Sequence, residues 1–286
     1  MSILKLRKKY HNQIGLKLLR IRQNAVKGDY PNNADGDSRI SVGIAWEITR
    51  QIIKNPVTGN ISGQQAGSIF ETLTKNFLES AFGLLSHIRP GRWIYSTNVN
   101  ISEFDQYRDL ASIDNIIKQN KTLASTIGQD YLISPDIVIG RTPISDDEFN
   151  AKKSIIGLKD LSVKHTPLRA SNYSQMKPIL HASISCKWTL RSDRGQNART
   201  EALNLIRNRK GNLPHIVAVT AEPTATRIAS LALGTGDIDC VYHFALYEFI
   251  EAIKSLKDES QLDMVNTLVE GRRLRDISDL PFDLAI

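Results

Sequence analysis

An acidic and a basic side chain in this sequence are of the types that hydrolysis of a phosphodiester bond uses. Asp136 follows Pro135 at the start of a short apolar segment, and Lys187 ends a longer apolar segment 51 residues later. Carboxylates hold Mg²⁺ against a phosphate, and a cation near the attacking water stabilises the charge that develops. The two residues therefore predict a centre for metal-assisted hydrolysis, provided that the fold places their segments side by side.

The segment that ends at Lys187 has the pattern of a long strand. Side chains alternate along a strand, so Ser185 and Lys187 are expected on one face and Cys186 on the other. Cys186 can still offer its backbone carbonyl as a hard metal ligand. Ser185 is not expected to be a nucleophile, because His181 lies four strand residues away, roughly 13 Å along the strand.

Helices and strands that would position these residues alternate along most of the chain. Apolar residues at helical spacing predict helices over residues 14–21, 42–53, 64–85, 104–119, 192–209, 224–233 and 246–256. Aromatic and β-branched runs predict strands over residues 93–99, 134–140, 179–188, 215–220 and 238–243. The pattern predicts an α/β fold with a mixed central sheet flanked by helices and a helical N-terminal layer. No repeat or linker interrupts it, so residues 1–286 are expected to form a single domain.

The charge of the chain favours a polyanionic partner. The formal net charge is +7 and the pI about 9.3, which favours nucleic acid or an anionic membrane surface. Residues 1–22 hold seven Lys or Arg and no acid, and residues 187–210 hold seven Lys or Arg and two acids. The first tract is either a solvated helix face or frayed terminus, or an arm that contacts phosphates. No apolar run in it is long enough for a signal peptide or membrane span, which predicts a cytosolic protein.

Several other kinds of site are disfavoured. The two cysteines, Cys186 and Cys240, lie in apolar surroundings that favour buried reduced thiols. With six scattered histidines they give no zinc-ligand spacing. Residues 234–236, Gly-Thr-Gly, lack the third glycine and the lysine of a phosphate-binding loop and predict a turn.

The catalytic candidates resemble the active-site pattern of the restriction endonucleases of the PD-(D/E)xK class. Pro135-Asp136 precedes one strand, and Lys187 lies on the next long one. The sequence departs from the general pattern at Ser185, where the class usually has Asp or Glu. Glu201, 14 residues after the lysine on the following helix, can bring a carboxylate into that space. This exchange is typical of the tetrameric endonucleases that cut around a CCGG core, and the chain is similar to that family.

The segment from Arg191 to Arg194 supports the same resemblance. Its two arginines can donate to O6 and N7 of two guanines, and Asp193 can accept from N4 of cytosine. Such a segment taken alone is usually a solvated helix cap with surface ion pairs. At the start of a helix, between the lysine and Glu201, it resembles the segment that reads CCGG in this family.

Four further candidates come from the resemblance. Glu71 lies on the helix expected at residues 64–85, where the family has a glutamate near the active site; taken alone, it would be a solvated acid. Gln64, seven residues earlier on the same helical face, could then reach the minor groove. Arg227 and Asp35 are candidates for reading the outer base pair.

The resemblance implies specific roles at the active site. It implies two Mg²⁺ ions, with Asp136 binding both, and Lys187 positioning or activating the water. Ser185 would support the site by hydrogen bonding. The remaining ligands would be Glu201, Glu71 and the carbonyl of Cys186.

The resemblance also implies a function for the whole protein. That function is a type II restriction endonuclease acting on a palindromic CCGG-core site, with GCCGGC as the expected full site. It would cut before the first C of the core and leave four-base 5′ overhangs. A homotetramer of two back-to-back dimers and a cognate DNA methyltransferase in the same bacterial cytoplasm are implied as well.

Two other functions remain open from the sequence. A non-cleaving DNA-binding protein, such as a regulator, would use the same basic tracts, and Lys187→Ala would leave its function intact. A structure-selective repair or recombination nuclease would share the catalytic core and would cut junctions or flaps whatever their sequence.

Overall fold

The computed structural model describes residues 1–120, 122, 125–126, 132–157, 160–172, 176–190, 192–234 and 236–286, without the side chains of residues 192–194. These residues form two compact units. Unit 1 comprises residues 1–90, 184–202 and 216–286, and unit 2 comprises residues 91–183 and 203–215. The single domain expected over residues 1–286 stays a prediction.

A six-stranded mixed sheet has the strand order β4-β5-β6-β7-β8-β9. Its strands are β4 (Trp93–Thr97), β5 (Ile137–Arg141), β6 (Ile179–Lys187), β7 (His215–Thr220), β8 (Cys240–His243) and β9 (Leu274–Asp276). β4 and β5 are antiparallel, whereas β7, β8 and β9 are parallel neighbours. The sheet confirms the predicted mixed α/β class. β5 begins after Pro135, which has no N–H to donate to a ladder, and β9 is too short to leave an alternating pattern in the sequence.

Most helices lie in unit 1, together with a small sheet of order β2-β1-β3. The helices are α1 (Ile3–Lys17), α2 (Arg39–Ile52), α3 (Gly63–Gly83), α8 (Ala225–Ala232), α9 (Leu246–Leu256), α10 (Glu259–Glu270) and α11 (Leu280–Asp283). The small strands are β1 (Arg20–Arg22), β2 (Tyr30–Pro31) and β3 (Val57–Thr58). Helix α7 (Ser192–Asn208) begins in unit 1 and ends in unit 2. No helix in the described part of the chain is long and apolar enough to cross a membrane.

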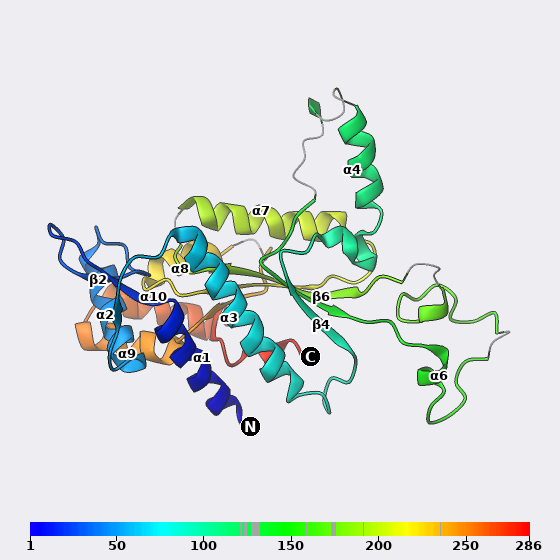
Figure 1. Cartoon of the computed structure of the whole chain (residues 1–286), viewed down its shortest axis with the longest axis horizontal. Helices are drawn as coiled ribbons and strands as arrows, with labels where there is room; N and C mark the ends of the chain where they lie inside the picture. Colours follow the sequence, from blue (N-terminus) through cyan, green and yellow to red (C-terminus); the bar gives the residue numbers. More distant parts are fainter. Residues whose placement is uncertain are drawn as a thin grey trace. The chain divides into compact units, whose positions relative to one another are not determined.

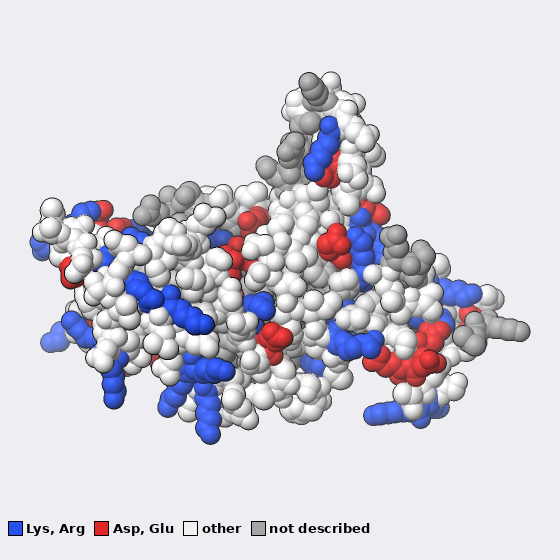
Figure 2. Space-filling model, in the orientation of Figure 1, with Lys and Arg blue, Asp and Glu red and all other residues white. Residues whose placement is uncertain are grey.

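The first basic tract forms a helix that the sequence pattern placed too late. α1 spans Ile3–Lys17 rather than residues 14–21, and the Ser2 side chain caps it by accepting a hydrogen bond from the Lys5 N–H. Leu6, Tyr10 and Ile14 form a buried stripe at four-residue spacing, hidden in the sequence among basic residues. The lysines of this helix, Lys5, Lys8, Lys9 and Lys17, are exposed, whereas Arg7 is buried. Lys and Arg side chains stand out over this part of the molecule in Figure 2. A phosphate contact by these lysines stays a prediction.

Helices α1 and α3 lie side by side in unit 1 (Figure 1). The rings of Tyr10 and Phe77 are 5.1 Å apart, and the Tyr10 hydroxyl lies 2.9 Å from that of Thr74. Further along α3, the ring of Phe70 lies 5.2 Å from that of Trp188, the residue after β6. α3 therefore packs against both the N-terminal helix and the end of the strand that carries Lys187.

A buried ion-pair network ties α1 to the C-terminal part of unit 1. The Arg7 guanidinium donates to Asp276 of β9 at 2.9 and 2.8 Å, and to Glu248 of α9 at 2.7 and 2.5 Å. The Asp276 side chain is fully buried. The bonds from Arg7 and its charge outweigh the burial penalty and lower the pKa of Asp276 and of Glu248.

Unit 2 contains the 3₁₀ turns η1 (Ile101–Glu103), η2 (Asp105–Tyr107) and η3 (Ala170–Asn172), with helices α4 (Leu110–Gln119) and α6 (Asp146–Phe149). The helix expected over residues 104–119 is therefore shorter than predicted. The amide of Gln106 explains this, because it bonds to both the N–H and the carbonyl of Leu180 in β6, at 2.8 and 2.7 Å. This tertiary pairing holds residues 105–107 against the strand in place of a continuous helix.

Candidate active site

Asp136 lies immediately before β5, which begins three residues later than the strand expected over residues 134–140. Its side chain is partly exposed, while Pro135 and the strand residues Ile137 to Ile139 are buried. A rigid buried strand thus fixes the position of a carboxylate at its amino end.

The end of β6 carries the candidate lysine. Ser185 and Cys186 are 9% and 4% exposed, and Lys187, the last strand residue, is partly exposed. The Lys187 carbonyl accepts hydrogen bonds from the Thr220 hydroxyl at 2.9 Å and from the Ala221 N–H at 3.3 Å. The backbone that bears the lysine is therefore anchored to the last residue of β7 and to the residue that follows it. Cys186 and Cys240 are both buried free thiols, as predicted.

Residues 220–224, which we call the clasp, also hold the chain three residues beyond Lys187. The N–H of Leu190 donates to Oε2 of Glu222 at 2.9 Å, and the Thr224 hydroxyl donates to Oε1 at 2.5 Å. The carbonyl of Glu222 lies 3.2 Å from Nε2 of His243. Burial raises the pKa of the Glu222 carboxyl, against the lowering effect of these hydrogen bonds. The clasp thus fixes both ends of the span from Lys187 to Leu190.

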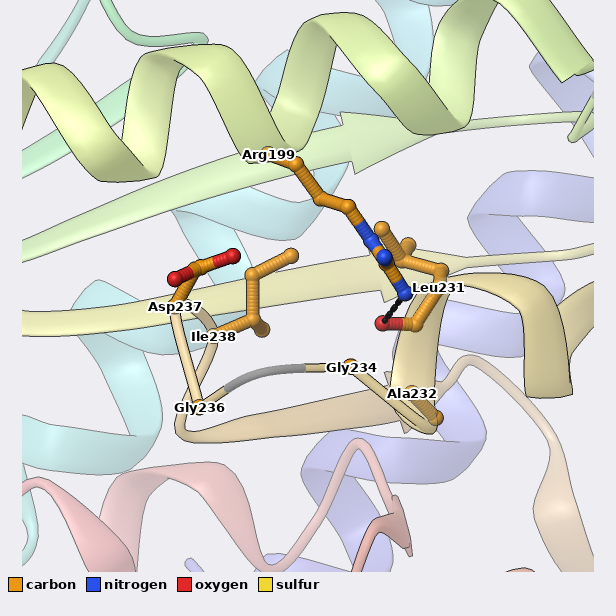
Figure 3. Close-up of a pocket in the computed structure, with 7 residues that line it drawn as sticks. All are labelled: Arg199, Leu231, Ala232, Gly234, Gly236, Asp237 and Ile238. Carbon is orange, nitrogen blue, oxygen red and sulfur yellow. Dashed lines mark hydrogen bonds between the residues drawn. The ribbon is translucent and has the colours of Figure 1, made fainter.

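The predicted base-reading segment follows directly after Leu190. Arg191 lies outside the described residues, and Asp193 and Arg194 lie in the first turn of α7 with their side chains outside the described part. Further along α7, Arg199 donates to the carbonyls of Ser230 and Leu231 at 2.6 and 3.4 Å. Figure 3 shows the bond to Leu231. These carbonyls end helix α8, where a cation is favoured. α7 is therefore attached to α8, and the clasp holds Leu190, two residues before α7 begins.

Two candidate acids lie on helices of unit 1. Glu201 on α7 and Glu71 on α3 are both partly exposed. Oε1 of Glu71 lies 3.7 Å from where a Cβ at Gly67 would be, so this side chain leans toward the amino end of α3. Gln64 is exposed on the first turn of the same helix. Within the described residues, no group of three or more His, Cys, Asp or Glu could hold a metal ion.

The two candidates for the outer base pair contact each other. Arg227 on α8 donates to the carboxylate of Asp35, and its Nη1 lies 3.9 Å from Oε1 of Glu222. Burial lowers the pKa of Arg227, but the bond to Asp35 and both negative charges raise it overall. Both side chains remain about one-third exposed, at 38% and 31%. The pair is thus charged and open to solvent.

A family model described as NgoMIV restriction enzyme matches residues 10–286 of this chain. The chain belongs to the NgoMIV restriction enzyme family. The type II restriction enzyme NgoMIV of Neisseria gonorrhoeae is 48% identical over 260 residues, which cover 89% of this chain and 90% of the relative. This member of the NgoMIV family is accordingly a type II restriction enzyme, a site-specific deoxyribonuclease.

Two solved structures are more distantly similar. A complex of restriction endonuclease PspGI with substrate DNA has 16% identity and a TM-score of 0.37, over 86% of this chain and 66% of that chain. The type IIF restriction endonuclease Bse634I with cognate DNA has 14% identity and a TM-score of 0.36, over 70% of this chain and 78% of that chain. Neither likeness is close enough to locate the site.

Membership of the NgoMIV family decides among the three functions that the sequence left open. A restriction enzyme cleaves DNA at a specific sequence, so the non-cleaving regulator and the structure-selective nuclease are excluded. The roles of individual residues stay predictions.

Sequence reasoning did not single out the clasp as part of the site. Glu222 is the only acid in residues 215–225, an otherwise largely apolar run. Burying a carboxylate is costly unless hydrogen bonds compensate. A single acid in an apolar run is therefore the feature of the sequence that could have indicated a buried, hydrogen-bonded carboxylate. Its partner Leu190, 32 residues earlier in the sequence, becomes a neighbour only through the tertiary fold.

Proposed function

We propose that this enzyme cuts double-stranded DNA at palindromic GCCGGC, before the first C of the CCGG core, and leaves four-base 5′ overhangs. The observation that carries the proposal is the anchored span from Lys187 to Leu190, which ends where the predicted base-reading segment begins. Identity of 48% to the NgoMIV enzyme supports the same site preference.

The residues predicted to hold Mg²⁺ have the chemistry that this ion prefers. Asp136, Glu201 and Glu71 supply carboxylate oxygens, and Cys186 can supply a backbone carbonyl. Their partial exposure, with Cys186 as the buried exception, suits ligands that keep some metal-bound water. Two bound Mg²⁺ ions would supply charge neutralisation at the phosphate and an acidified water.

In this proposal the protein's own groups divide the remaining work. Lys187 positions or activates the attacking water, and Ser185 supports it by hydrogen bonding. Arg191, Asp193 and Arg194 read the CCGG core in the major groove, where two guanidinium groups match guanine and a carboxylate matches cytosine. Arg227 and Asp35 read the outer base pair, and Gln64 contacts the minor groove.

The proposal extends to assembly and partners. The enzyme acts as a homotetramer of two back-to-back dimers in the bacterial cytoplasm. A cognate DNA methyltransferase protects the same sequence in the host chromosome. Sedimentation equilibrium of the purified protein tests the oligomer, and a monomeric mass at micromolar concentration would contradict it.

Cleavage of defined DNA tests the site itself. A plasmid with one GCCGGC and two matched plasmids, with one core or one outer base pair exchanged, are incubated with enzyme and Mg²⁺. We expect a cut only in the first plasmid, with 5′ ends starting at the first C of CCGG, and no cut in EDTA. Cutting at another sequence, or equal cutting of all three plasmids, would refute the proposed specificity.

A further inference from the structure

The carboxylate of Glu222 contacts Leu190, the residue before the proposed core-reading segment, and also lies close to Arg227, a proposed outer reader. We propose that Glu222 is a positioning residue for sequence recognition, which holds the start of the Arg191–Arg194 segment and Arg227 in one arrangement. This inference rests on the proposed function, because it takes both elements to be base readers.

The first link runs to the core-reading segment. Oε2 of Glu222 accepts the N–H of Leu190 at 2.9 Å, and Leu190 is 2% exposed. Leu190 is the residue before Arg191, so this bond sets where the backbone enters the segment. With the Lys187 carbonyl held by Thr220, the backbone between lysine and segment has two fixed points.

The second link runs to the candidate outer reader. Nη1 of Arg227 lies 3.9 Å from Oε1 of Glu222, the oxygen that also accepts from the Thr224 hydroxyl. Because the Glu222 side chain is only 1% exposed, its charge is poorly screened and attracts the guanidinium more strongly than a surface acid would. Asp35 binds another nitrogen of the same guanidinium.

The same clasp also holds the loop that carries Asp35. The Asn33 amide donates to the Ala221 carbonyl at 3.0 Å, and Asn33 is 1% exposed. Arg199 joins α7 to the last turn of α8 through the carbonyl of Leu231 (Figure 3). These contacts join the backbone at Leu190, the loop and α8 to the clasp or to one another, and Glu222 is the only charged side chain of the clasp.

The chemistry of this position requires an acceptor with two oxygens. The Leu190 N–H and the Thr224 hydroxyl each donate to one carboxylate oxygen, and the Arg227 guanidinium lies 3.9 Å from Oε1 as a charge partner. A glutamine amide at this position has one oxygen, which can accept the hydrogen bond from the Leu190 N–H. Its NH₂ group would then face Thr224, whose hydroxyl can rotate to accept a hydrogen bond. Glu222→Gln therefore keeps the first link and weakens the second, whereas Glu222→Ala removes both.

The experiment measures kcat/KM for three duplexes: the cognate site, one core substitution and one outer substitution. The core and outer discrimination ratios are the kcat/KM for the cognate duplex divided by that for the duplex with the core or the outer substitution. For Glu222→Ala we expect both ratios to fall about tenfold or more, the scale of a buried N–H left without an acceptor. For Glu222→Gln we expect the outer ratio to fall roughly threefold to tenfold, with the core ratio within about twofold of wild type. Two further variants are measured in parallel. Asp193→Ala is expected to lower only the core ratio, and Arg227→Ala is expected to lower only the outer ratio.

The control is Thr74→Val, which removes the hydrogen bond to Tyr10 in the α1–α3 core and touches neither reader. It is expected to lower the melting temperature and leave both ratios unchanged. If Glu222→Ala slows all three duplexes equally, its role is structural and the inference is wrong. If Glu222→Ala does not fold, an unchanged outer ratio in Glu222→Gln overturns the inference.

The outcomes separate this inference from the proposed function. If Asp193→Ala and Arg227→Ala lower their ratios while both Glu222 variants leave them unchanged, only the inference fails. If Asp193→Ala and Arg227→Ala leave the ratios unchanged, the assignment of the readers fails and the inference fails with it. If the wild-type enzyme prefers another sequence, the ratios are measured on that sequence.

Discussion

Lys187 ends a strand whose preceding residues are buried, so its ammonium group stands at the boundary between core and solvent. A cation placed beside developing negative charge typically contributes about 10²- to 10³-fold to a rate. We expect Lys187→Ala to lower single-turnover cleavage by at least about 100-fold, with DNA binding retained in a gel shift without Mg²⁺. Lys254→Ala, an exposed lysine paired with Glu251 on α9, serves as control and should cut at the wild-type rate. Full activity of Lys187→Ala would remove the lysine from the mechanism.

Strand β6 depends on its neighbour for the position of its last residue. Thr220 at the end of β7 donates its hydroxyl to the Lys187 carbonyl at 2.9 Å and accepts the Glu222 N–H at 3.1 Å. Thr220→Val keeps the volume and removes both bonds, so we expect a loss of about 1–3 kcal/mol in the free energy of unfolding, and slower cleavage. Thr267→Val, which removes a hydroxyl bond to Asp263 within exposed α10, should change neither quantity by much. Denaturant unfolding and cleavage rates of both variants test this expectation. Cleavage by Thr220→Val at the wild-type rate would show that this hydrogen bond is not needed to position Lys187.

On the scale of the whole molecule, acid should destabilise the fold through a buried histidine. His243 is fully buried, its Nδ1 accepts the Ala245 N–H at 3.2 Å, and burial lowers its pKa to about 4. A proton on Nδ1 would point at the Ala245 N–H, so protonation of His243 would break this hydrogen bond. In the unfolded chain this histidine has an ordinary pKa near 6.5, so between pH 6.5 and pH 4 the unfolded state binds more protons than the folded state. The stability that comes from keeping His243 neutral is therefore complete above pH 6.5 and is lost as the pH falls toward 4.

The expected size of this loss is on the order of 3 kcal/mol between pH 6.5 and pH 4. The raised pKa of Glu222 acts in the opposite direction, because a buried carboxyl gains stability on protonation. The measurement is therefore the difference in unfolding free energy between wild type and His243→Gln at each pH. A difference that stays constant across this window would contradict the assignment.

The first helix and the last strand of the chain are joined by Arg7 and Asp276, 269 residues apart in sequence. Removing one partner of a buried pair leaves an uncompensated charge and typically costs about 3–5 kcal/mol. Arg7→Met is expected to lose that much in chemical denaturation, and the double variant Arg7→Met, Asp276→Asn should recover part of it. Strictly additive losses would mean that the two charges do not interact.

The local elements could be predicted wherever one pattern dominated a segment. The strand ending at Lys187 and helix α9 follow the sequence closely, because their apolar runs have a single period and clear ends. α1 was placed too late, because Leu6, Tyr10 and Ile14 lie among lysines and arginines whose charges mask the stripe. β9 was missed because three residues carry no period.

The sequence by itself supplied the family resemblance, through the residue types and spacing of Asp136, Lys187, Glu201 and the Arg191–Arg194 segment, and family membership confirms that resemblance. The roles of these residues stay predictions. Only the tertiary structure decided how the chain around Lys187 is held. The clasp residue Glu222 bonds to Leu190, which precedes it by 32 positions, and Arg227 pairs with Asp35 across 192 positions. Local sequence patterns describe residues that are close along the chain. The hydrogen-bond donors to a buried carboxylate can come from distant parts of the sequence, and only folding brings them together.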